Sequence, residues 1–307
     1  MTVGHVGNVA QTDFRSGFVA VVGRPNVGKS TLVNRLVGQK VSITSPRPQT
    51  TRGPIRGVRT GPGYQAIFVD TPGSQKPRDT LRARMQQQVL DSLSESDVIL
   101  FVLDATQAAG GLGPGDRYVA RLIIEAGTPA IACINKVDLL RTRDEALPIA
   151  EAVSALDKWR EIFPISAASG LNVEPLAGAV VDLLPPGPRY FPDETVTDYP
   201  ESLILGEYVR EKALNVLREE VPHAVAVEIE EVERKDNVTV VYATIFVERA
   251  SQRMIVLGKG GKTIKRIGTE ARRDVERLLG TRIYLDLKVK VRPGWRSDKK
   301  FLERLGL

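Results

Sequence analysis

The stretch GRPNVGKS, residues 23–30, follows an apolar run and precedes a pattern typical of an amphipathic helix. It fits the spacing G-x-x-x-x-G-K-[ST] of phosphate-binding loops. Backbone N–H groups must approach a polyanion closely, and a side chain at Gly28 would block that approach. Lys29 would supply a point charge to the β- and γ-phosphates, and Ser30 a hydroxyl ligand for Mg²⁺. The residues expected to bind nucleotide here are Gly23, Arg24, Pro25, Asn26, Val27, Gly28, Lys29, Ser30 and Thr31.

The chain of 307 residues is long enough for two domains with separate cores. Its longest apolar runs, such as residues 98–103, are too short to span a bilayer. Residues 1–16 have neither a basic start nor an apolar core, so we expect a cytoplasmic protein without a secretory signal. Cys133 is the only cysteine, which excludes an internal disulfide, and we interpret it as a buried structural thiol. With only two histidines, histidine-based catalysis and zinc sites lack ligands.

The net charge of +6 conceals a strong segregation of charge along the chain. Residues 249–307 hold 17 Lys and Arg against 6 Asp and Glu, whereas residues 189–248 hold 6 against 14. Such asymmetry is typical of a surface that binds a polyanion.

Strand and helix patterns alternate along the first 184 residues, which predicts an α/β domain with a mostly parallel six-stranded sheet and helices on both faces. Strands are expected at 18–23, 54–60, 64–70, 97–104, 129–135 and 161–166. Helices are expected at 29–38, 80–93, 116–126, 144–157 and 172–184. The turn at residues 60–63 is too short for a crossover, so the second and third strands should form an antiparallel hairpin at the sheet edge.

Three further motifs follow predicted strands, at the end of the sheet where ligands bind. Asp70 can reach a metal ion through water, and Gly73 can offer its N–H to a γ-phosphate. Asp138 can accept hydrogen bonds from N1–H and the 2-amino group of guanine, which adenine lacks. A backbone N–H after the last strand can meet guanine O6. The residues of these motifs are Asp70, Thr71, Pro72, Gly73, Asn135, Lys136, Val137, Asp138, Ser166 and Ala167.

This set of motifs, in this order, resembles the GTPase class of P-loop proteins. The resemblance implies GTP hydrolysis and a loop whose threonine joins Mg²⁺ when the γ-phosphate is present. Here that loop is VSITSPRPQTTRG, residues 41–53, called the switch loop below. Thr51 is the first choice and Thr50 the second, because the family's threonine precedes an arginine. The implied metal ligands are Ser30, Thr51 and Asp70, and the implied catalytic residues are Lys29, Thr51, Gly73 and Asn26.

The residue after Gly73 departs from Ras-like GTPases, in which a glutamine orients the attacking water. Here it is Ser74, and we interpret Gln75, one position later, as a polar loop residue. Several bacterial GTPases that resemble this chain lack the glutamine, and some bind K⁺ through an asparagine at the position of Asn26. We therefore expect slow intrinsic hydrolysis that is accelerated by K⁺, by a partner, or by both.

The run PPGP at 185–188 starts a linker to about residue 200. Beyond it we expect a helix at 202–217, strands at 224–232 and 238–247, a helix at 252–257, a longer helix and a strand at 282–291. The loop GKGG between the two later helices makes this order resemble an α+β type II KH domain, which binds single-stranded nucleic acid. Trp295 could stack on a base or anchor the tail. The expected RNA-binding residues are Gly258, Lys259, Gly260, Gly261, Lys262, Lys265 and Arg266.

The segments GRPNVGKS, PQTTRG, DTPG, NKVD and PISA, followed by VLGKGGKTIKRIGTEAR and KVKVRPGW, are similar to the Era family of bacterial GTPases. Ser74 stands where relatives often have an apolar residue. The resemblance implies a GTP-dependent assembly factor of the small (30S) ribosomal subunit that binds single-stranded 16S rRNA near its 3′ end. It also implies a cytoplasmic protein with some association at the inner membrane surface, which we expect to be a monomer. The expected divisions are an N-terminal tail at 1–16, a GTPase (G) domain at 17–184, a linker at 185–200 and a KH domain at 201–307.

Two other functions share some of these features. A signalling GTPase could use its C-terminal domain and basic tail to bind a protein or a membrane surface. A tRNA-modification enzyme would need a redox cofactor motif or a catalytic cysteine after residue 188, and the sequence has neither.

If GTP and RNA favour the same arrangement of the domains, each must tighten binding of the other by an equal factor, and hydrolysis would release the RNA.

Overall fold

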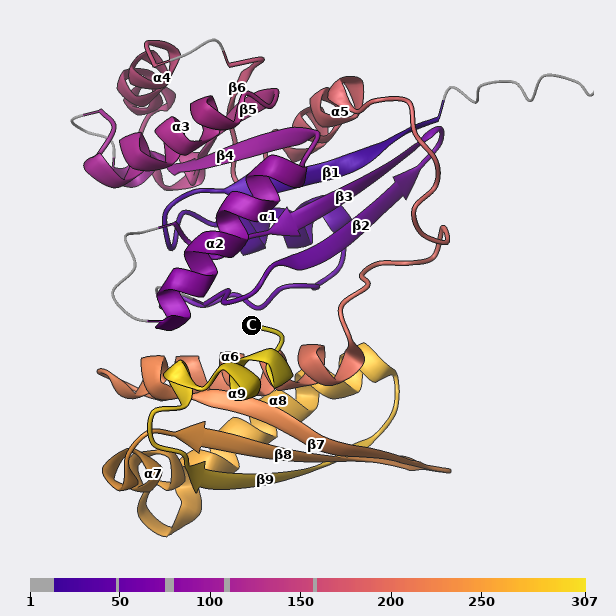
Figure 1. Ribbon diagram of the computed structural model, residues 1–307, viewed down its shortest axis with the longest axis vertical. Helices are drawn as coiled ribbons and strands as arrows, with labels where there is room; N and C mark the ends of the chain where they lie inside the picture. The colour runs from indigo at the N-terminus through magenta and orange to yellow at the C-terminus, as the bar shows by residue number, and fades with distance from the viewer. Residues whose placement is uncertain (1–13, 48–49, 75–79, 108–110, 157–158) are drawn as a thin grey trace, which may run out of the picture.

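The computed structural model describes residues 14–47, 50–74, 80–107, 111–156 and 159–307, in two parts joined by an extended linker (Figure 1). Within these ranges, no helix combines the length and the apolar content that a membrane span requires. The first part has strands β1 (Arg15–Val22), β2 (Ile55–Gly61), β3 (Tyr64–Asp70), β4 (Val98–Asp104), β5 (Ala130–Asn135) and β6 (Ile162–Pro164). Its helices are α1 (Lys29–Val37), α2 (Thr80–Glu95), α3 (Pro114–Ala126), α4 (Leu147–Ser154) and α5 (Val173–Leu183).

The six strands lie in the order β2-β3-β1-β4-β5-β6. All neighbours are parallel except β2 and β3, which form the expected antiparallel hairpin at the edge. Side chains alternate between the two faces: Val19 and Val21 of β1 pack toward α1 and α5, whereas Ala20 and Val22 pack toward α2, α3 and α4. Burial raises the pKa of the Cys133 thiol, in agreement with a structural role. The predicted α/β fold is confirmed.

Two elements of the G domain differ from the sequence-based expectation by three residues at an end, and β6 is shorter than the strand expected at 161–166. Strand β1 begins at Arg15, inside the expected tail. The Arg15 amide donates to the Gly63 carbonyl and the Ser16 amide donates to the Pro185 carbonyl, and these hydrogen bonds extend the strand. The helix expected at 144–157 is instead a 3-10 turn, η3 (Arg143–Ala146), followed by α4, which has a proline in its first turn. Proline has no N–H to donate and disfavours a continuous α-helix through the residues before it. Residue 157 lies outside the described residues.

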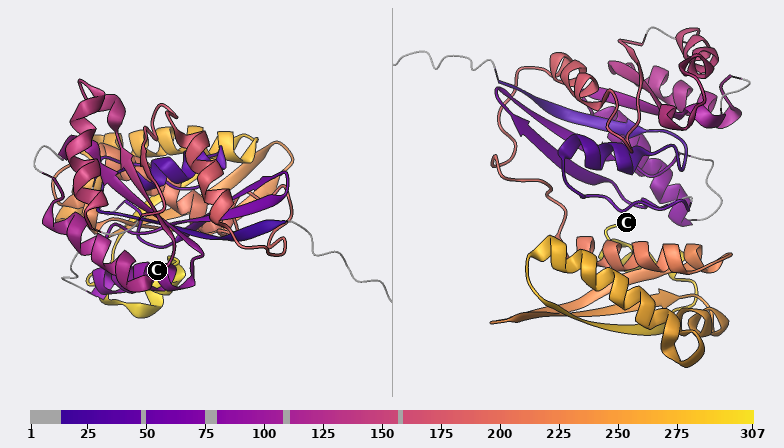
Figure 2. Two further views of the ribbon diagram at one scale, coloured as in Figure 1. Left: turned by 90° about the horizontal axis from the view of Figure 1, so that it is seen from above. Right: turned by 180° about the vertical axis from the view of Figure 1, so that it is seen from behind.

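The second part has the helix and strand order expected of a type II KH domain. Its elements are α6 (Glu201–Val216), β7 (Ala226–Lys235), β8 (Val238–Val247), α7 (Ala250–Leu257), α8 (Lys262–Leu279) and β9 (Ile283–Val291). Strand β8 is central, antiparallel to β7 and parallel to β9. Apolar residues of the three helices, among them Val209, Val256 and Ile267, form a core with the sheet. Helix α6 lies between this sheet and the G domain (Figure 2).

The C-terminal segment contains two elements that the sequence patterns did not predict, η6 (Trp295–Ser297) and α9 (Lys299–Arg304). Trp295 is fully buried, and its indole Nε1 donates to the Ala224 carbonyl at 3.0 Å. It packs with Phe301 and with Met85 of α2, so the segment contacts the G domain. Of the two possible roles of Trp295, anchoring the tail is therefore the one that the structure supports.

We expect Trp295→Ala to lower the free energy of unfolding of the C-terminal domain by about 3 kcal/mol, because it removes a large buried side chain and leaves a cavity. Urea denaturation followed by circular dichroism would measure the change. Lys299→Ala, at an exposed position nearby, is the matched control and should change stability by less than about 0.5 kcal/mol. Equal stabilities for the two variants would contradict the anchoring role.

Candidate functional site

The sequence motifs of the G domain come together at the carboxyl ends of its strands. Part of this set lines a cavity of about 370 Å³, whereas Asp70, Asp138, Ser166 and Ala167 are not among its lining residues. Its lining residues are Pro25, Asn26, Gly28, Lys29, Ser30, Thr31, Ile43, Thr44, Ser45, Pro46, Thr50, Thr51, Gly73 and Lys136. The cavity thus collects residues of the phosphate-binding loop, the switch loop and the segments after β3 and β5.

Two glycines of the phosphate-binding loop are required by close contacts as well as by conformation. A Cβ at Gly23 would lie 2.3 Å from the Val102 carbonyl oxygen, and one at Gly28 would lie 2.2 Å from Asn135 Nδ2. Gly28 also has φ of 101°, a backbone conformation that favours glycine. Any side chain at either position would push the loop away from the sheet.

Lys29 is the buried cation of the site. Its Nζ donates to the carbonyls of Gly23 at 3.2 Å and Arg24 at 3.0 Å. Burial lowers the pKa of Lys29 to about 8, although the nearby Asp70 carboxylate opposes that shift. Anionic phosphates would stabilise the protonated form, so phosphate binding and protonation of Lys29 are linked.

Three oxygen-bearing side chains converge on one point. Asp70 Oδ2 accepts from Ser30 Oγ at 2.7 Å and from Thr51 Oγ1 at 3.0 Å, and the two hydroxyl oxygens are 2.9 Å apart. Asp70 Oδ1 is buried with no hydrogen-bond partner, and burial raises the pKa of this carboxyl despite the attraction of Lys29. Hard oxygen ligands and an unpaired buried carboxylate oxygen fit Mg²⁺. Thr50 Oγ1 instead donates to the Arg47 carbonyl, so the geometry favours Thr51.

The segment after β3 packs tightly against the phosphate-binding loop. A Cβ at Gly73 would lie 2.8 Å from the backbone nitrogen of Pro25, and the Ser74 amide donates to the Gly23 carbonyl at 3.2 Å. The Ser74 hydroxyl is buried and does not line the cavity, so it does not occupy the position of a water-orienting glutamine. Gln75 lies outside the described residues.

The motifs after β5 and β6 are joined by the side chain of Asn135. Its Nδ2 donates to the Val27 carbonyl at 2.8 Å, and its Oδ1 accepts from the Ala167 amide at 2.9 Å. One amide group thus ties the phosphate-binding loop to the segment expected to meet guanine O6. Asp138 lies in the 3-10 turn η2 (Val137–Leu139) with its carboxylate exposed, whereas Ser166 is fully buried.

Asn26 has a positive φ of 66°, and its Nδ2 donates to the Pro46 carbonyl of the switch loop at 2.8 Å. Asn34 of α1 also holds this loop: its Oδ1 accepts from the Val41 and Ser42 amides, and its Nδ2 donates to the Ser42 carbonyl. Asn34 was not predicted as a site residue, because its sequence position is that of an ordinary helix residue. No local pattern reveals a contact with a loop seven residues farther on.

The G-x-x-G loop of the KH domain joins α7 to α8. A Cβ at Gly258 would lie 2.1 Å from Thr263 Oγ1, whereas Gly260 and Gly261 have positive φ values of 60° and 75° and open space around them. The α8 helix starts at Lys262, so its unpaired N–H groups face the loop. The cations Lys259, Lys262, Lys265 and Arg266 are exposed.

A groove of about 350 Å³ runs between α8 and β9, beside this loop. Its lining residues are Ile264, Lys265, Gly268, Thr269, Arg272, Ile283, Tyr284, Leu285 and Leu287. Gly268 brings the helix close to the strand, since a Cβ there would lie 3.2 Å from Leu287. Of this set only Lys265 was predicted to bind RNA, because the other residues become neighbours only when α8 packs on β9.

Comparison with known proteins identifies both parts. A family model described as 50S ribosome-binding GTPase matches residues 18–136, and one described as KH domain matches residues 220–296. GTPase Era of Carboxydothermus hydrogenoformans is 46% identical over 295 residues, 95% of this chain and 98% of that protein. GTPase Era of Lacticaseibacillus paracasei is 45% identical over 296 residues, 96% and 97% of the two chains. This chain belongs to the Era family of GTPases.

Two solved structures of Era are similar over almost the whole chain. One is Era in complex with MgGDPNP and nucleotides 1506–1542 of 16S ribosomal RNA; it is 41% identical with a TM-score of 0.92 and covers 95% of this chain and 99% of that chain. The other is a variant of Aquifex aeolicus Era bound to GDP·AlF4⁻, also 41% identical, with a TM-score of 0.91 and the same coverage. The order of a GTPase domain followed by a KH domain is therefore that of Era.

We expect the affinity of this Era-family protein for GDP, measured without Mg²⁺, to fall about threefold between pH 7.5 and 8.5. The pKa of Lys29 in the free protein is about 8, so the fraction that carries the ammonium falls across this window. Titration calorimetry at several pH values would measure the effect. In Lys29→Arg the guanidinium stays protonated, so its affinity should be nearly independent of pH; a flat profile for the unsubstituted protein would contradict the role of Lys29.

Proposed function

We propose that this Era-family GTPase is an assembly factor of the small ribosomal subunit that binds single-stranded RNA near the 3′ end of 16S rRNA. The observation that carries the proposal is the similarity to an Era structure that contains nucleotides 1506–1542 of 16S rRNA, over 95% of this chain. The exposed cations around the G-x-x-G loop and the groove between α8 and β9 supply the required chemistry. We place the protein in the cytoplasm, with the inner membrane surface as a further site of association.

Within this proposal, the G domain binds GTP through the motifs that line the cavity. Ser30, Thr51 and Asp70 are the candidate holders of Mg²⁺, which when bound neutralises developing phosphate charge. Lys29 contributes a second positive charge, and the Gly73 amide is a donor for the γ-phosphate. Asp138 reads the guanine edge, and amides of the segment at 166–167 meet O6.

Hydrolysis is expected to be slow without a stimulator, because Ser74 replaces the water-orienting glutamine, is buried and does not line the cavity. The Nδ2 group of Asn26 donates a hydrogen bond to the switch loop. Its Oδ1 is therefore left as a ligand for K⁺ beside the phosphates. A cation at this position would stabilise the charge that develops during phosphoryl transfer.

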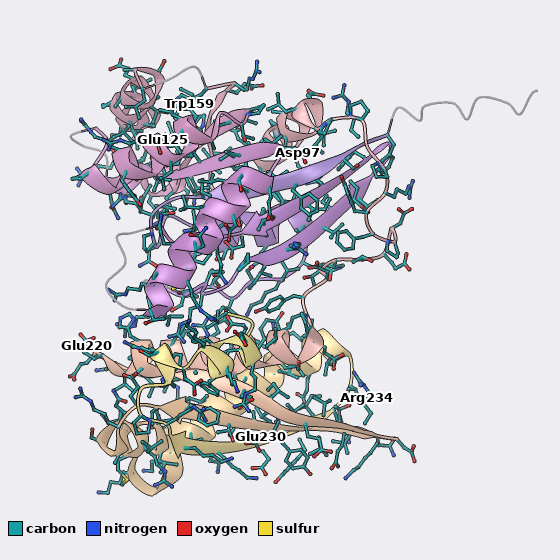
Figure 3. The ribbon with its side chains drawn as sticks, viewed as in Figure 1. Asp97, Glu125, Trp159, Glu220, Glu230 and Arg234 are labelled. Carbon is teal, nitrogen blue, oxygen red and sulfur yellow. The ribbon has the colours of Figure 1, made fainter. Side chains whose placement is uncertain are left out.

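The switch loop is also where the two domains meet, which provides a physical route for coupling. Glu211 of α6 accepts from the Thr44 amide at 2.8 Å and from Lys40 Nζ at 2.7 Å. Lys40 also reaches Asp274 of α8 at 3.4 Å, on the helix that follows the G-x-x-G loop. Side chains of both domains fill this region (Figure 3). A nucleotide that changes the switch loop thereby biases the KH domain, and RNA biases the nucleotide site equally.

The alternative in which a basic tail binds a membrane surface receives less support from the structure. Lys290 pairs with Glu230 at 2.8 Å, and Arg304 pairs with Glu228 at 3.2 Å. Arg296 donates to the His223 carbonyl. These basic side chains of the final segment pair within the KH domain, although Lys290 and Arg304 stay about half exposed. Around the G-x-x-G loop Arg266 pairs with Glu270, whereas Lys259, Lys262 and Lys265 are exposed lysines available to a polyanion.

Binding of a fluorescent single-stranded RNA that matches the 3′ end of 16S rRNA tests the proposal. We expect about tenfold tighter binding with a non-hydrolysable GTP analogue than with GDP, because both ligands favour one domain arrangement. Gly260→Asp should abolish binding by placing a carboxylate among the phosphates. Gly260→Asn is the matched control, because it has the same shape without the charge and tolerates positive φ. RNA binding that ignores both the nucleotide and Gly260→Asp would overturn specific binding at the G-x-x-G loop and its coupling to GTP, and would leave the GTPase assignment intact.

The potassium ligand is tested by GTP turnover in the presence of this RNA, in KCl and NaCl of equal ionic strength. We expect turnover in K⁺ to be faster, on the order of tenfold. Asn26→Ala should lose the difference, whereas Asn26→Asp should keep it because an oxygen remains. Identical turnover in the two salts would show that Asn26 serves only to hold the switch loop.

A further inference from the structure

Asp104, at the carboxyl end of β4, is a buried carboxylate that none of the GTPase motifs includes. It is only 2% exposed. Its Oδ1 accepts from the amide and the hydroxyl of Thr106, at 3.0 and 2.7 Å. Its Oδ2 accepts from Lys136 Nζ at 2.6 Å and from Gln107 Nε2 at 3.3 Å. Both oxygens are therefore fully used, and one of them holds the lysine of the guanine-binding motif.

The same network reaches the phosphate-binding loop. Gln107 Oε1 accepts from Arg24 Nη2 at 2.8 Å. Arg24 is held in turn by Asp116 of α3, a carboxylate that is 4% exposed, at 2.7 Å from Arg24 Nε. Side chains thus connect Arg24 of the phosphate-binding loop to Lys136 of the motif after β5. Because the Asp104 carboxylate is buried, its pairing with Lys136 is weakly screened and constrains the geometry more than a surface ion pair would.

Lys136 determines how the next turn starts. It has φ of 69°, a left-handed conformation that is unfavourable for a residue with a side chain, and it immediately precedes η2, which carries Asp138. Its side chain lines the nucleotide cavity. An anchored ammonium offsets the backbone strain and fixes the direction in which η2 leaves β5.

We infer that Asp104 is a positioning residue for base specificity: by holding the Lys136 ammonium, it sets the start of η2 and so aims the Asp138 carboxylate at the guanine edge. Asp104 does not contact the nucleotide itself. Its loss should therefore weaken recognition of the 2-amino group more than it weakens binding of the rest of the nucleotide.

The substitution Asp104→Asn isolates this role because it keeps the shape and removes the charge. If the NH2 group of the new asparagine faces Lys136 and Gln107, it cannot accept their hydrogen bonds. If the amide is flipped, the NH2 group instead faces the amide and the hydroxyl of Thr106, which donate to Asp104 in the unsubstituted protein. Affinities for GDP and for inosine diphosphate, which lacks the 2-amino group, are measured on the full-length protein. We expect GDP binding to weaken about tenfold and the preference for GDP over inosine diphosphate to fall at least threefold.

Asp97→Asn is the matched control, since Asp97 lies just before the opposite end of β4 (Figure 3) and its Oδ2 accepts from the Phe18 amide at 2.8 Å. It should lower thermal stability without changing the preference between the two nucleotides. Asp104→Glu, which keeps the charge, should retain most of the preference. An unchanged preference in a folded Asp104→Asn variant would overturn the inference.

If Asp104→Asn does not fold, Lys136→Met provides the test, because Asp104 acts only through that ammonium. The preference for GDP should fall at least threefold in this variant as well. In a folded variant that combines Asp104→Asn with Lys136→Met, the preference for GDP over inosine diphosphate should fall no further than in Lys136→Met alone. A Lys136→Met variant that keeps the full preference would refute the inference.

Discussion

The nucleotide site and the attachment of the switch loop both depend on the buried carboxyl group of Asp70. A buried carboxylate is costly unless donors or a cation surround it. Ser30 of α1 and Thr51 of the switch loop donate to one oxygen, and Lys29 supplies a positive charge nearby. Because one donor comes from a helix of the G domain and the other from the switch loop, satisfying this carboxylate holds the switch loop against the sheet.

Residues of the switch loop on either side of Thr51 contact the KH domain. Arg52, next to Thr51, donates from Nη1 to the Val225 carbonyl at 2.7 Å and lies over the ring of Trp295. Earlier in the switch loop, Ile43 packs with Leu205 of α6. The residues beside the donors of Asp70 are thus packed into the other domain. This is the physical requirement for coupling, since one element with alternative positions is biased from both sides.

The two ligand-binding regions differ in how they are built. The phosphate-binding loop is held by buried contacts that leave no room for a Cβ at Gly23 or Gly28. The G-x-x-G loop instead has open space around Gly260 and Gly261 and exposed cations beside them. A small, highly charged ligand needs a closely fitting, preorganised loop, whereas a nucleic acid strand needs an accessible backbone surface with neutralising charge.

Local chemistry in the sequence determined the order of strands and helices and the β2–β3 hairpin, and it was enough to predict which residues are candidates to bind phosphate, base and RNA backbone. Glycine spacing, apolar runs and turn lengths act within a few residues, so their structural consequences can be predicted from the sequence alone. Only the tertiary structure placed Thr51 rather than Thr50 against Asp70, buried Trp295 against Ala224, and brought Asp104 to Lys136 and Arg24 to Asp116. Those pairs are 19 to 92 residues apart, and no local pattern encodes them, because such contacts exist only once the sheets and helices have packed.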